Sequence, residues 1–281
     1  MSDDKLRVLV IGAHPDDPEW YAGGVIAKYA RQGHSVRLVT LTNGDAGHST
    51  LHGEELARRR RAEAAAAGAC LGVEVVVLDN HDTMLFPTLE VRADVIRQMR
   101  EFRPDLVMTH RPWDYHADHR YTAQAVQDAI IPACYVPSVV PELLPLQPMP
   151  RVVFMWDEFT RPYPFIADVV VGIDDAVDKK IEALGCHTSQ VYDGAAAAPG
   201  STLPADPEGR RAWLRQQEEP WLRVEADLYR ERLVELYGEE RGRQIRYAEA
   251  FELCEYGKSG SEITPMLSDA ERRRLFPFYG P

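Results

Sequence analysis

The sequence contains few cysteines, and none of them stand close together. Its four cysteines are separated by more than fifty positions and form no CxxC pair. This spacing excludes a zinc site made of thiolates and gives no indication of a disulfide framework. A protein that stays reduced in the cytoplasm fits the pattern best.

The chain also lacks long apolar runs and an excess of basic residues. No stretch approaches the roughly 18 uninterrupted apolar residues of a membrane span. The start, MSDDKLRVLVIGA, has neither the basic region nor the long apolar region of a signal peptide. With 32 basic and 44 acidic residues, the formal net charge is -12, which opposes binding to phosphate backbones and anionic membranes. We expect a cytoplasmic protein with no nucleic-acid and no membrane partner. The sequence leaves open whether the protein forms a homo-oligomer.

Short apolar runs alternate with helical patterns through the first part of the chain, which is typical of parallel βαβ units. Right-handed crossovers would wind the strands into one twisted sheet with helices on both faces. The predicted fold is therefore Rossmann-like, with three α/β/α layers and a mainly parallel sheet. Strands are expected at 7–13, 35–42, 74–79, 105–110, 152–156 and 167–173, and helices at about 24–32, 54–70, 90–102, 119–131 and from 175.

The second part of the chain is less regular in composition. The proline-rich stretch 136–150 cannot hold a regular helix or a central strand and is predicted to be a long surface loop. A flexible connection is expected from about 194, followed by charged, helix-forming sequence. We expect a single domain over 1–281, with a core at about 5–190 and a C-terminal helical extension at about 205–281.

Charged side chains follow the first and the fourth predicted strands. The first strand ends in GAHPDDPE, which places one imidazole and three carboxylates within six residues, and the fourth ends in THRPWDYHADHR. Ligands bind beyond the carboxyl ends of the strands in an open parallel sheet, so the two segments are expected to meet there. The carboxylates would repel one another unless a cation or hydrogen bonds neutralised them. Histidine and aspartate ligands with one open position suit a catalytic zinc ion.

These residues resemble the motifs of a known family, the PIG-L/LmbE-like zinc-dependent de-N-acetylases of the N-acetylglucosaminyl deacetylase type. AHPDDPEWYAGG is similar to the family's AHPDD motif, and HADHR is similar to its second motif, of the form HxDH. TNGDAGH, RRAEAAAAGACLGV, HDTML, HTSQ and YAEAFE extend the resemblance over most of the chain. This sequence departs from the family pattern in one respect. Pro18 follows the aspartate pair, where many relatives have glutamate, so Glu19 is displaced by one position.

The resemblance implies a role for each matching residue. His14, Asp17 and His119 would bind zinc, and Asp16 would be the general base that activates the metal-bound water. As further catalytic residues, His116 would stabilise the oxyanion, and Asp118 would support the charge and orientation of His116.

Two further residues match positions at which relatives contact the sugar. Arg60 and Asp82 would bind substrate hydroxyl groups. Without the resemblance, Arg60 would be a solvated charge on a helix whose arginines pair with glutamates at i,i+4, and either residue type is common on any surface. Asp16 or Asp17 could likewise only cap the first helix. The roles of His48, His52 and His187 stay undecided.

The sequence therefore predicts a zinc hydrolase that removes an N-acyl group, expected to be acetyl, from an amino sugar or a sugar-bearing small molecule. Two alternatives remain open: a zinc amidase that acts on a thiol conjugate or another specialised-metabolite amide, and a carbohydrate-binding relative without activity. A nicotinamide enzyme is disfavoured, since the glycines of the first motif do not form GxGxxG.

Overall fold

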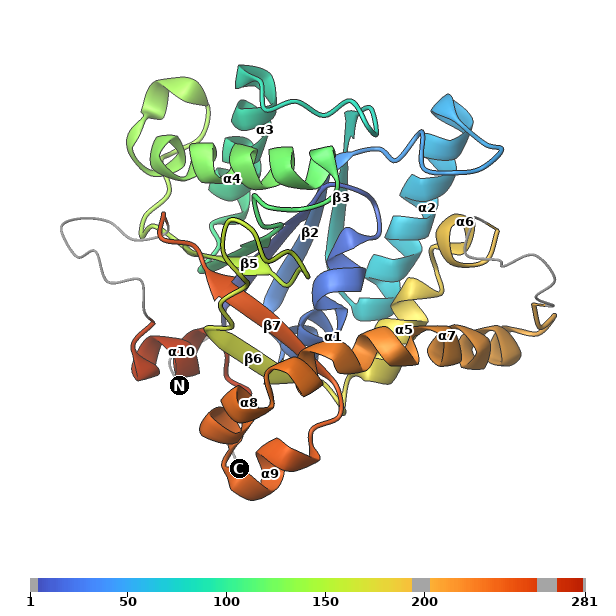
Figure 1. The fold of residues 1–281 in the computed structure, drawn as a ribbon. Coiled ribbons are helices and arrows are strands. Elements are labelled where there is room, and N and C mark those ends of the chain that lie inside the picture. Colours follow the sequence, from blue (N-terminus) through green and yellow to red (C-terminus); the bar gives the residue numbers. More distant parts are fainter. Residues whose placement is uncertain (1–4, 194–202, 257–266, 280–281) are drawn as a thin grey trace.

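A seven-stranded sheet forms the centre of the protein, in the order β3-β2-β1-β4-β5-β7-β6 (Figure 1). The computed structural model of the protein describes residues 5–193, 203–256 and 267–279. The strands are β1 (Arg7–Gly12), β2 (Ser35–Thr42), β3 (Glu74–Asn80), β4 (Leu106–Thr109), β5 (Arg151–Met155), β6 (Val169–Gly172) and β7 (Ala248–Leu253). The first five pair in parallel, whereas β7 runs antiparallel to both β5 and β6. The predicted α/β fold with a mainly parallel sheet is confirmed.

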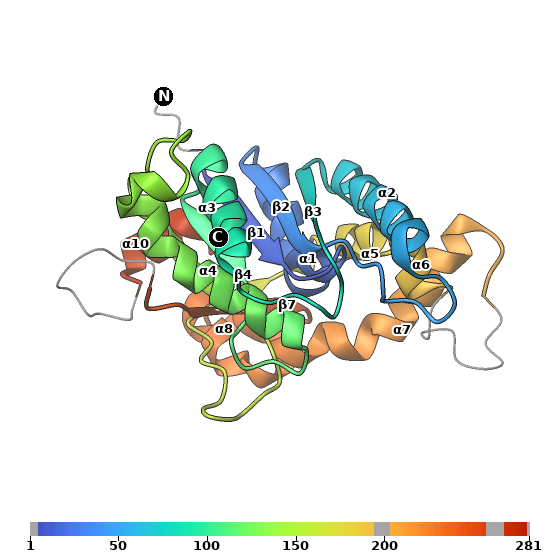
Figure 2. The ribbon, with the colours of Figure 1, turned by 90° about the horizontal axis from the view of Figure 1, so that it is seen from above.

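Helices cover both faces of the sheet, which gives the molecule three layers (Figure 2). Side chains of β1 alternate between the faces: Val8 and Val10 pack with the α1, α2 and α5 side, and Leu9 and Ile11 with the α3 and α4 side. The helices are α1 (Asp17–Arg31), α2 (Gly53–Leu71), α3 (Leu89–Phe102), α4 (Ala117–Tyr135), α5 (Val177–Leu184), α6 (Thr188–Val191), α7 (Pro207–Leu228), α8 (Arg230–Tyr237), α9 (Glu239–Gln244) and α10 (Asp269–Leu275). Within the described ranges, none of these helices is both long and apolar enough to cross a membrane.

Several boundaries differ from the predicted ones. Helix α1 begins at Asp17 instead of Gly24, with Pro18 in its first turn, where proline's fixed backbone angle is favourable. Helix α4 runs to Tyr135 and so reaches the proline-rich stretch, which is irregular apart from a 3-10 turn at Pro137–Val139. The expected flexible connection falls partly on residues 194–202, which lie outside the described residues.

Strand β7 was not predicted, because its sequence AEAFEL reads as well as a helix. Its Glu249 is fully buried in the sheet. The carboxylate accepts hydrogen bonds from the backbone N–H groups of Gly24 (2.9 Å) and Val25 (2.7 Å) and from Lys180 Nζ (2.7 Å). These partners make the burial of the acid tolerable. A single domain remains our prediction, with β7 as part of its central sheet.

The chain reverses its direction of travel across the sheet between β1 and β4, which are parallel neighbours. Their carboxyl ends therefore lie side by side, and the loops that follow them open at the same edge. This is the switch point at which open α/β sheets bind ligands.

Candidate active site

The chain turns sharply after β1 and brings His14, Asp16 and Asp17 to the edge of the sheet. The backbone N–H groups of Asp16 and Asp17 both donate to the carbonyl oxygen of His14, at 2.8 and 3.1 Å. A Cβ on Gly12 would lie 2.8 Å from Cβ of Asp17, so the turn requires glycine there. Although Asp16 directly precedes α1, its side chain makes no capping hydrogen bond, and a capping role does not account for it.

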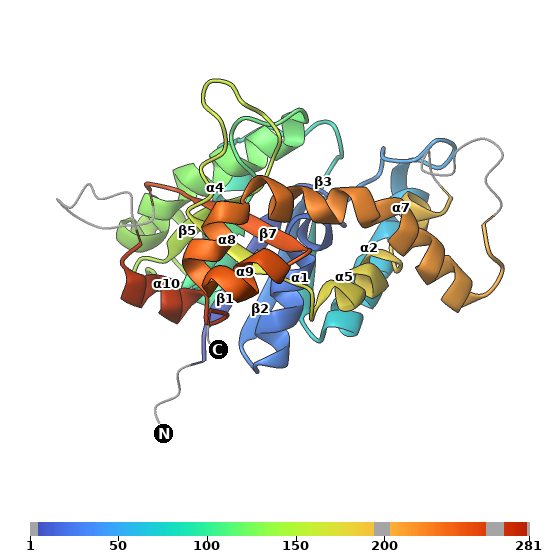
Figure 3. The same cartoon turned by 60° about the horizontal axis from the view of Figure 1, so that its bottom comes forward.

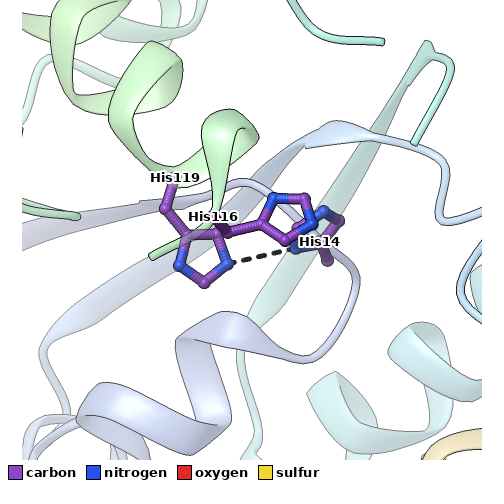
Figure 4. A group of neighbouring side chains, drawn as sticks. All are labelled: His14, His116 and His119. Carbon is purple, nitrogen blue, oxygen red and sulfur yellow. Dashed lines mark hydrogen bonds between the residues drawn. The ribbon is translucent and has the colours of Figure 1, made fainter. Parts of the chain in front are cut away.

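Donor atoms of His14, Asp17 and His119 lie close together beside this turn. His14 Nδ1 and His119 Nε2 lie 3.2 Å apart (Figure 4). Asp17 Oδ1 lies 3.5 Å from His119 Nε2, and Asp17 Oδ2 lies 3.4 Å from His14 Nδ1. Ligand atoms at zinc–nitrogen distances around a tetrahedral ion are about 3.3 Å from one another. The three donors thus fit a shared divalent ion.

Neighbouring groups fix the orientation of each donor. Asp17 Oδ2 accepts from the backbone N–H groups of Ala13 (2.9 Å) and His14 (2.7 Å) and from His110 Nε2 (2.9 Å), which leaves Oδ1 facing His119. Asp114 Oδ2 accepts from Nδ1 of His119 at 3.1 Å. Carboxylates that bind the outer nitrogen of a metal-ligating histidine set its tautomer and ring direction. Asp114 and His110 were missed by the sequence analysis, because each acts through another residue.

His14 is held in the same way by two other carboxylates. Its Nε2 lies 3.2 Å from Asp118 Oδ2 and 3.2 Å from Asp82 Oδ1, so Nδ1 is the nitrogen that faces His119. Asp118 Oδ2 also accepts from the backbone N–H of Thr83 at 2.7 Å. Thr83 has a left-handed backbone (φ 67°), which is strained for a β-branched residue and is typical of functional sites.

The electrostatics of this cluster favour positive charge. Burial would lower the pKa of His119, but Asp17 and Asp114 outweigh it and raise the pKa to about 9. The pKa of His14 is also raised against burial, by Asp17, Asp118 and Asp82. The pKa of Asp17 is held well below its ordinary value despite burial, because His119, His110 and His14 surround it. A pocket that stabilises imidazolium charge so strongly can equally stabilise a metal ion.

Other combinations of donors in the same cluster are also close enough to share an ion. These combinations are His14, His116 and His119; Asp17, His110 and His119; and His14, Asp82, His116 and Asp118. His110 stacks on His119 with ring centroids 3.9 Å apart, and its Nε2 is already engaged by Asp17. His116 meets His14 edge to face, with centroids 4.7 Å apart (Figure 4). The closest donor contacts among His14, Asp17 and His119, at 3.2 to 3.5 Å, are near the expected tetrahedral spacing and involve both oxygens of Asp17.

Asp16 is paired with a buried arginine. Arg60 Nη2 donates to Asp16 Oδ1 at 2.6 Å, and Arg60 Nη1 lies 3.6 Å from Asp82 Oδ2. Arg60 is only 2% exposed, so it is not a solvated helix charge, unlike the exposed Arg58 of the same run. Gly44 has a positive φ of 71°, and any Cβ there would lie within 2.5 Å of Arg60 Nη1. Arg60 and Asp82 both border the cavity, but their closest contacts are with Asp16 and His14.

The expected support of His116 by the Asp118 carboxylate takes a different form. His116 Nδ1 accepts a hydrogen bond from the backbone N–H of Asp118 at 3.1 Å, whereas the Asp118 carboxylate bonds to His14 and Thr83. His116 ends up at the N-terminus of α4, where that backbone bond caps the helix. Burial and the charges of His14 and His119 lower the pKa of His116.

The three undecided histidines lie apart from the donor cluster. His48 Nδ1 accepts from the backbone N–H groups of Thr50 (3.1 Å) and Leu51 (3.0 Å), which is a local turn role. His52 is exposed, just before α2. His187 is fully buried and lies 3.6 Å from Glu19 Oε2.

The donor cluster lies in a cavity of about 670 Å³. Its second wall comes from the stretch after β5, from α5 and from helix α7, which lies beside α5 (Figure 3). No local motif marks these residues, because only the tertiary fold brings them to the site. They include Trp156, Asp157, Glu158, Phe159, Lys180, Glu218, Trp221, Leu222 and Glu225.

Residues 9–130 match the PIG-L family model, described as GlcNAc-PI de-N-acetylase. The chain is 33% identical over 198 residues to diacetylchitobiose deacetylase of Thermococcus kodakarensis, covering 67% of this chain and 71% of that protein. The N,N'-diacetylchitobiose deacetylase of Pyrococcus horikoshii has a similar structure, with a TM-score of 0.67 and 28% identity, over 88% of this chain and 83% of that one. The chain belongs to the PIG-L family of de-N-acetylases.

A relative with another activity is similarly close. The 4-oxalmesaconate hydratase of Pseudomonas putida is 31% identical over 210 residues, covering 68% of this chain and 77% of that protein. Family membership therefore fixes the fold, and the reaction must be argued from the residues of the site.

Proposed function

We propose that the protein is a zinc-dependent N-deacetylase, which removes an N-acyl group, expected to be acetyl, from an amino sugar or a sugar-bearing small molecule in the cytoplasm. The observation that carries the proposal is the convergence of His14, Asp17 and His119, with donor atoms 3.2 to 3.5 Å apart, beside the buried Asp16–Arg60 pair. The relatives named as deacetylases of N-acetylated sugars support the choice of reaction.

His14 Nδ1, Asp17 Oδ1 and His119 Nε2 would hold the ion. Zinc bound there lowers the pKa of a coordinated water toward about 7 and polarises the acyl oxygen. Asp114 and Asp118 keep the two imidazoles in the tautomers that binding requires.

Asp16 would accept the proton of the attacking water. Arg60 holds one oxygen of Asp16 at 2.6 Å, which restricts the direction in which the other can point. Because Asp16 is only 8% exposed, few bulk waters compete for it. This arrangement suits a general base that works at one fixed position.

In its protonated form, His116 would donate a hydrogen bond to the developing negative charge on the acyl oxygen and pass its proton to the leaving amine, and the proton that Asp16 accepts from water would restore the protonated form. Asp82 is partly neutralised by His14 and Arg60, so its pKa is lowered against burial and it stays a hydrogen-bond acceptor at the cavity wall. We assign Asp82 to a sugar hydroxyl, and Arg60 to orienting Asp16 first and to substrate second.

Hydration of a carboxylate-bearing substrate is the main competing reaction, since one relative is named as a hydratase. The cationic side chains that line the cavity, histidines aside, are Arg60 and Lys180. Arg60 is paired with Asp16, and Lys180 lies 2.7 Å from Glu249. Neither is free to bind a carboxylate, so the described part of the cavity favours deacetylation.

The deciding experiment incubates the zinc-loaded protein with N-acetylglucosamine and its glycosides. We expect equimolar acetate and primary amine, loss of both after chelation, and recovery when zinc is returned. Activity that survives complete metal removal would contradict the proposal. Binding of the glycosides without release of either product would instead indicate the carbohydrate-binding alternative.

A further inference from the structure

The cavity is larger than the removal of an acetyl group requires, and aromatic rings line it. Its volume of about 670 Å³ is within the range that encloses drug-sized ligands. An N-acetylated monosaccharide seated at the donor cluster would fill only part of this volume. Three indole rings line the space, from Trp20, Trp156 and Trp221.

Helix α7 supplies the most exposed of these rings and is firmly anchored. Trp221 is 61% exposed and borders the cavity. Two residues before Trp221, Glu219 Oε1 accepts from Tyr247 Oη at 2.6 Å, and four residues after it, Glu225 accepts from the backbone N–H of Ala250. A large apolar ring held in water at the rim of a cavity is typical of a recognition surface.

The same wall is poor in free positive charge. Its acidic residues are Asp157, Glu158, Glu218 and Glu225, and its cation, Lys180, is paired with the buried Glu249. Burial raises the pKa of Asp157 to about 6 and that of Glu225 to about 8. Burial thus disfavours the charged forms of Asp157 and Glu225, so a further negative charge beside them would be poorly solvated, whereas a positive charge would be stabilised.

We propose that this second wall, centred on Trp221 of α7, is an aglycone subsite that selects amino sugars carrying a neutral or cationic, ring-containing group and rejects anionic ones. The proposal rests on the proposed function, which it deepens. Residues 156–159 and 218–225 lie outside the part of the chain that matches the family model, residues 9–130. The subsite is therefore built from segments that follow the matched region.

The test compares four substrates on the zinc-loaded protein: N-acetylglucosamine and its phenyl, aminomethylphenyl and carboxyphenyl β-glycosides. We expect kcat/KM at least tenfold higher for the phenyl and aminomethylphenyl glycosides than for the free sugar, and at least tenfold lower for the carboxyphenyl than for the phenyl glycoside. Equal values for all four would overturn the proposal.

Two variants locate the effect. Trp221→Ala should reduce kcat/KM for the phenyl glycoside at least fivefold more than for the free sugar, mainly through KM. Leu228→Ala is the matched control, because Leu228 is exposed on the same helix but does not line the cavity. An equal loss on both substrates in Trp221→Ala would contradict the subsite.

Failure of the proposed function can be told apart from failure of the subsite. If no substrate releases amine, the deacetylase assignment fails, and the dissociation constants of the same four compounds test the subsite by themselves. Tighter binding of the phenyl glycoside, weakened at least fivefold by Trp221→Ala, would still support it. Binding that does not depend on the aglycone would overturn it.

Discussion

The two walls of the cavity differ in the chemistry of their side chains. At the ends of β1 and β4, acids and imidazoles are packed together with less than 10% exposure and hold one another by hydrogen bonds, as in His14, Asp17 and His119. At α7 and after β5, indole rings alternate with carboxyl groups whose pKa values are raised by burial. The first wall holds charged side chains at defined positions, whereas the second wall disfavours ionised side chains and presents apolar rings for contact. Changes in the first should therefore alter chemistry, and changes in the second should alter binding and stability.

The largest effect is expected from Asp16→Asn in the first wall. Asparagine retains an oxygen that can accept from Arg60 but cannot take up a proton from water. We expect kcat to fall by about 10² to 10⁴, with the metal retained. Steady-state kinetics together with metal analysis would check this, and a wild-type rate in the metal-loaded variant would remove Asp16 from the mechanism.

His116→Ala should rank next. Loss of a group that stabilises developing negative charge costs about 10² to 10³ in kcat. The variant should still bind metal, because we assign His116 no place among the ligands. If the metal were lost instead, the set His14, His116 and His119 would become the better description of the site.

Asp114→Ala should lower the metal affinity of the first wall indirectly, through His119. Without the carboxylate that holds Nδ1 of His119, metal affinity should fall by about 10- to 100-fold. Competition with a chelator of known affinity measures the change. The control is Asp128→Ala, at an exposed position on α4, the helix that carries His119. This variant should bind metal as the wild type does.

The smallest effect is expected in the second wall, from Glu225→Gln. Burial raises the folded-state pKa of Glu225 to about 8, above its ordinary value of 4.5. The folded protein therefore keeps this proton while the unfolded chain loses it, so stability should fall as pH rises from about 4.5 to about 8. Glutamine can still accept from Ala250 but does not titrate.

Melting temperatures across this pH range would reveal the difference. The variant should match the wild type near pH 5 and exceed it above pH 8. Parallel curves for the two proteins would show that Glu225 ionises normally, and the second wall would then be more highly charged than we describe.

The first wall could be predicted from the sequence because its residues are concentrated in two short segments. Each follows a strand whose apolar pattern is plain, and parallel neighbours bring strand ends together. The partners that orient the ligands were harder to foresee. Asp118 was expected to support His116, but its carboxylate bonds to His14 across 104 positions of chain, a pairing that depends on the loop at Thr83.

The individual residues of the second wall could not be predicted, since they carry no motif and reach the site only through tertiary contacts. The segment AEAFEL forms β7 because its buried Glu249 accepts hydrogen bonds from Lys180 and from two backbone N–H groups of α1. Those contacts outweigh the helical preference of alanine and glutamate. Helix α7 was expected as a helix, but its place beside the cavity depends on the docking of Glu225 and Glu219 against the residues around β7.

Metal content provides the most direct test of the first wall. Protein purified from zinc-supplemented cells should contain about one zinc per chain, and His14→Ala, with unchanged circular dichroism, should contain almost none. Full zinc occupancy in folded His14→Ala would contradict the account.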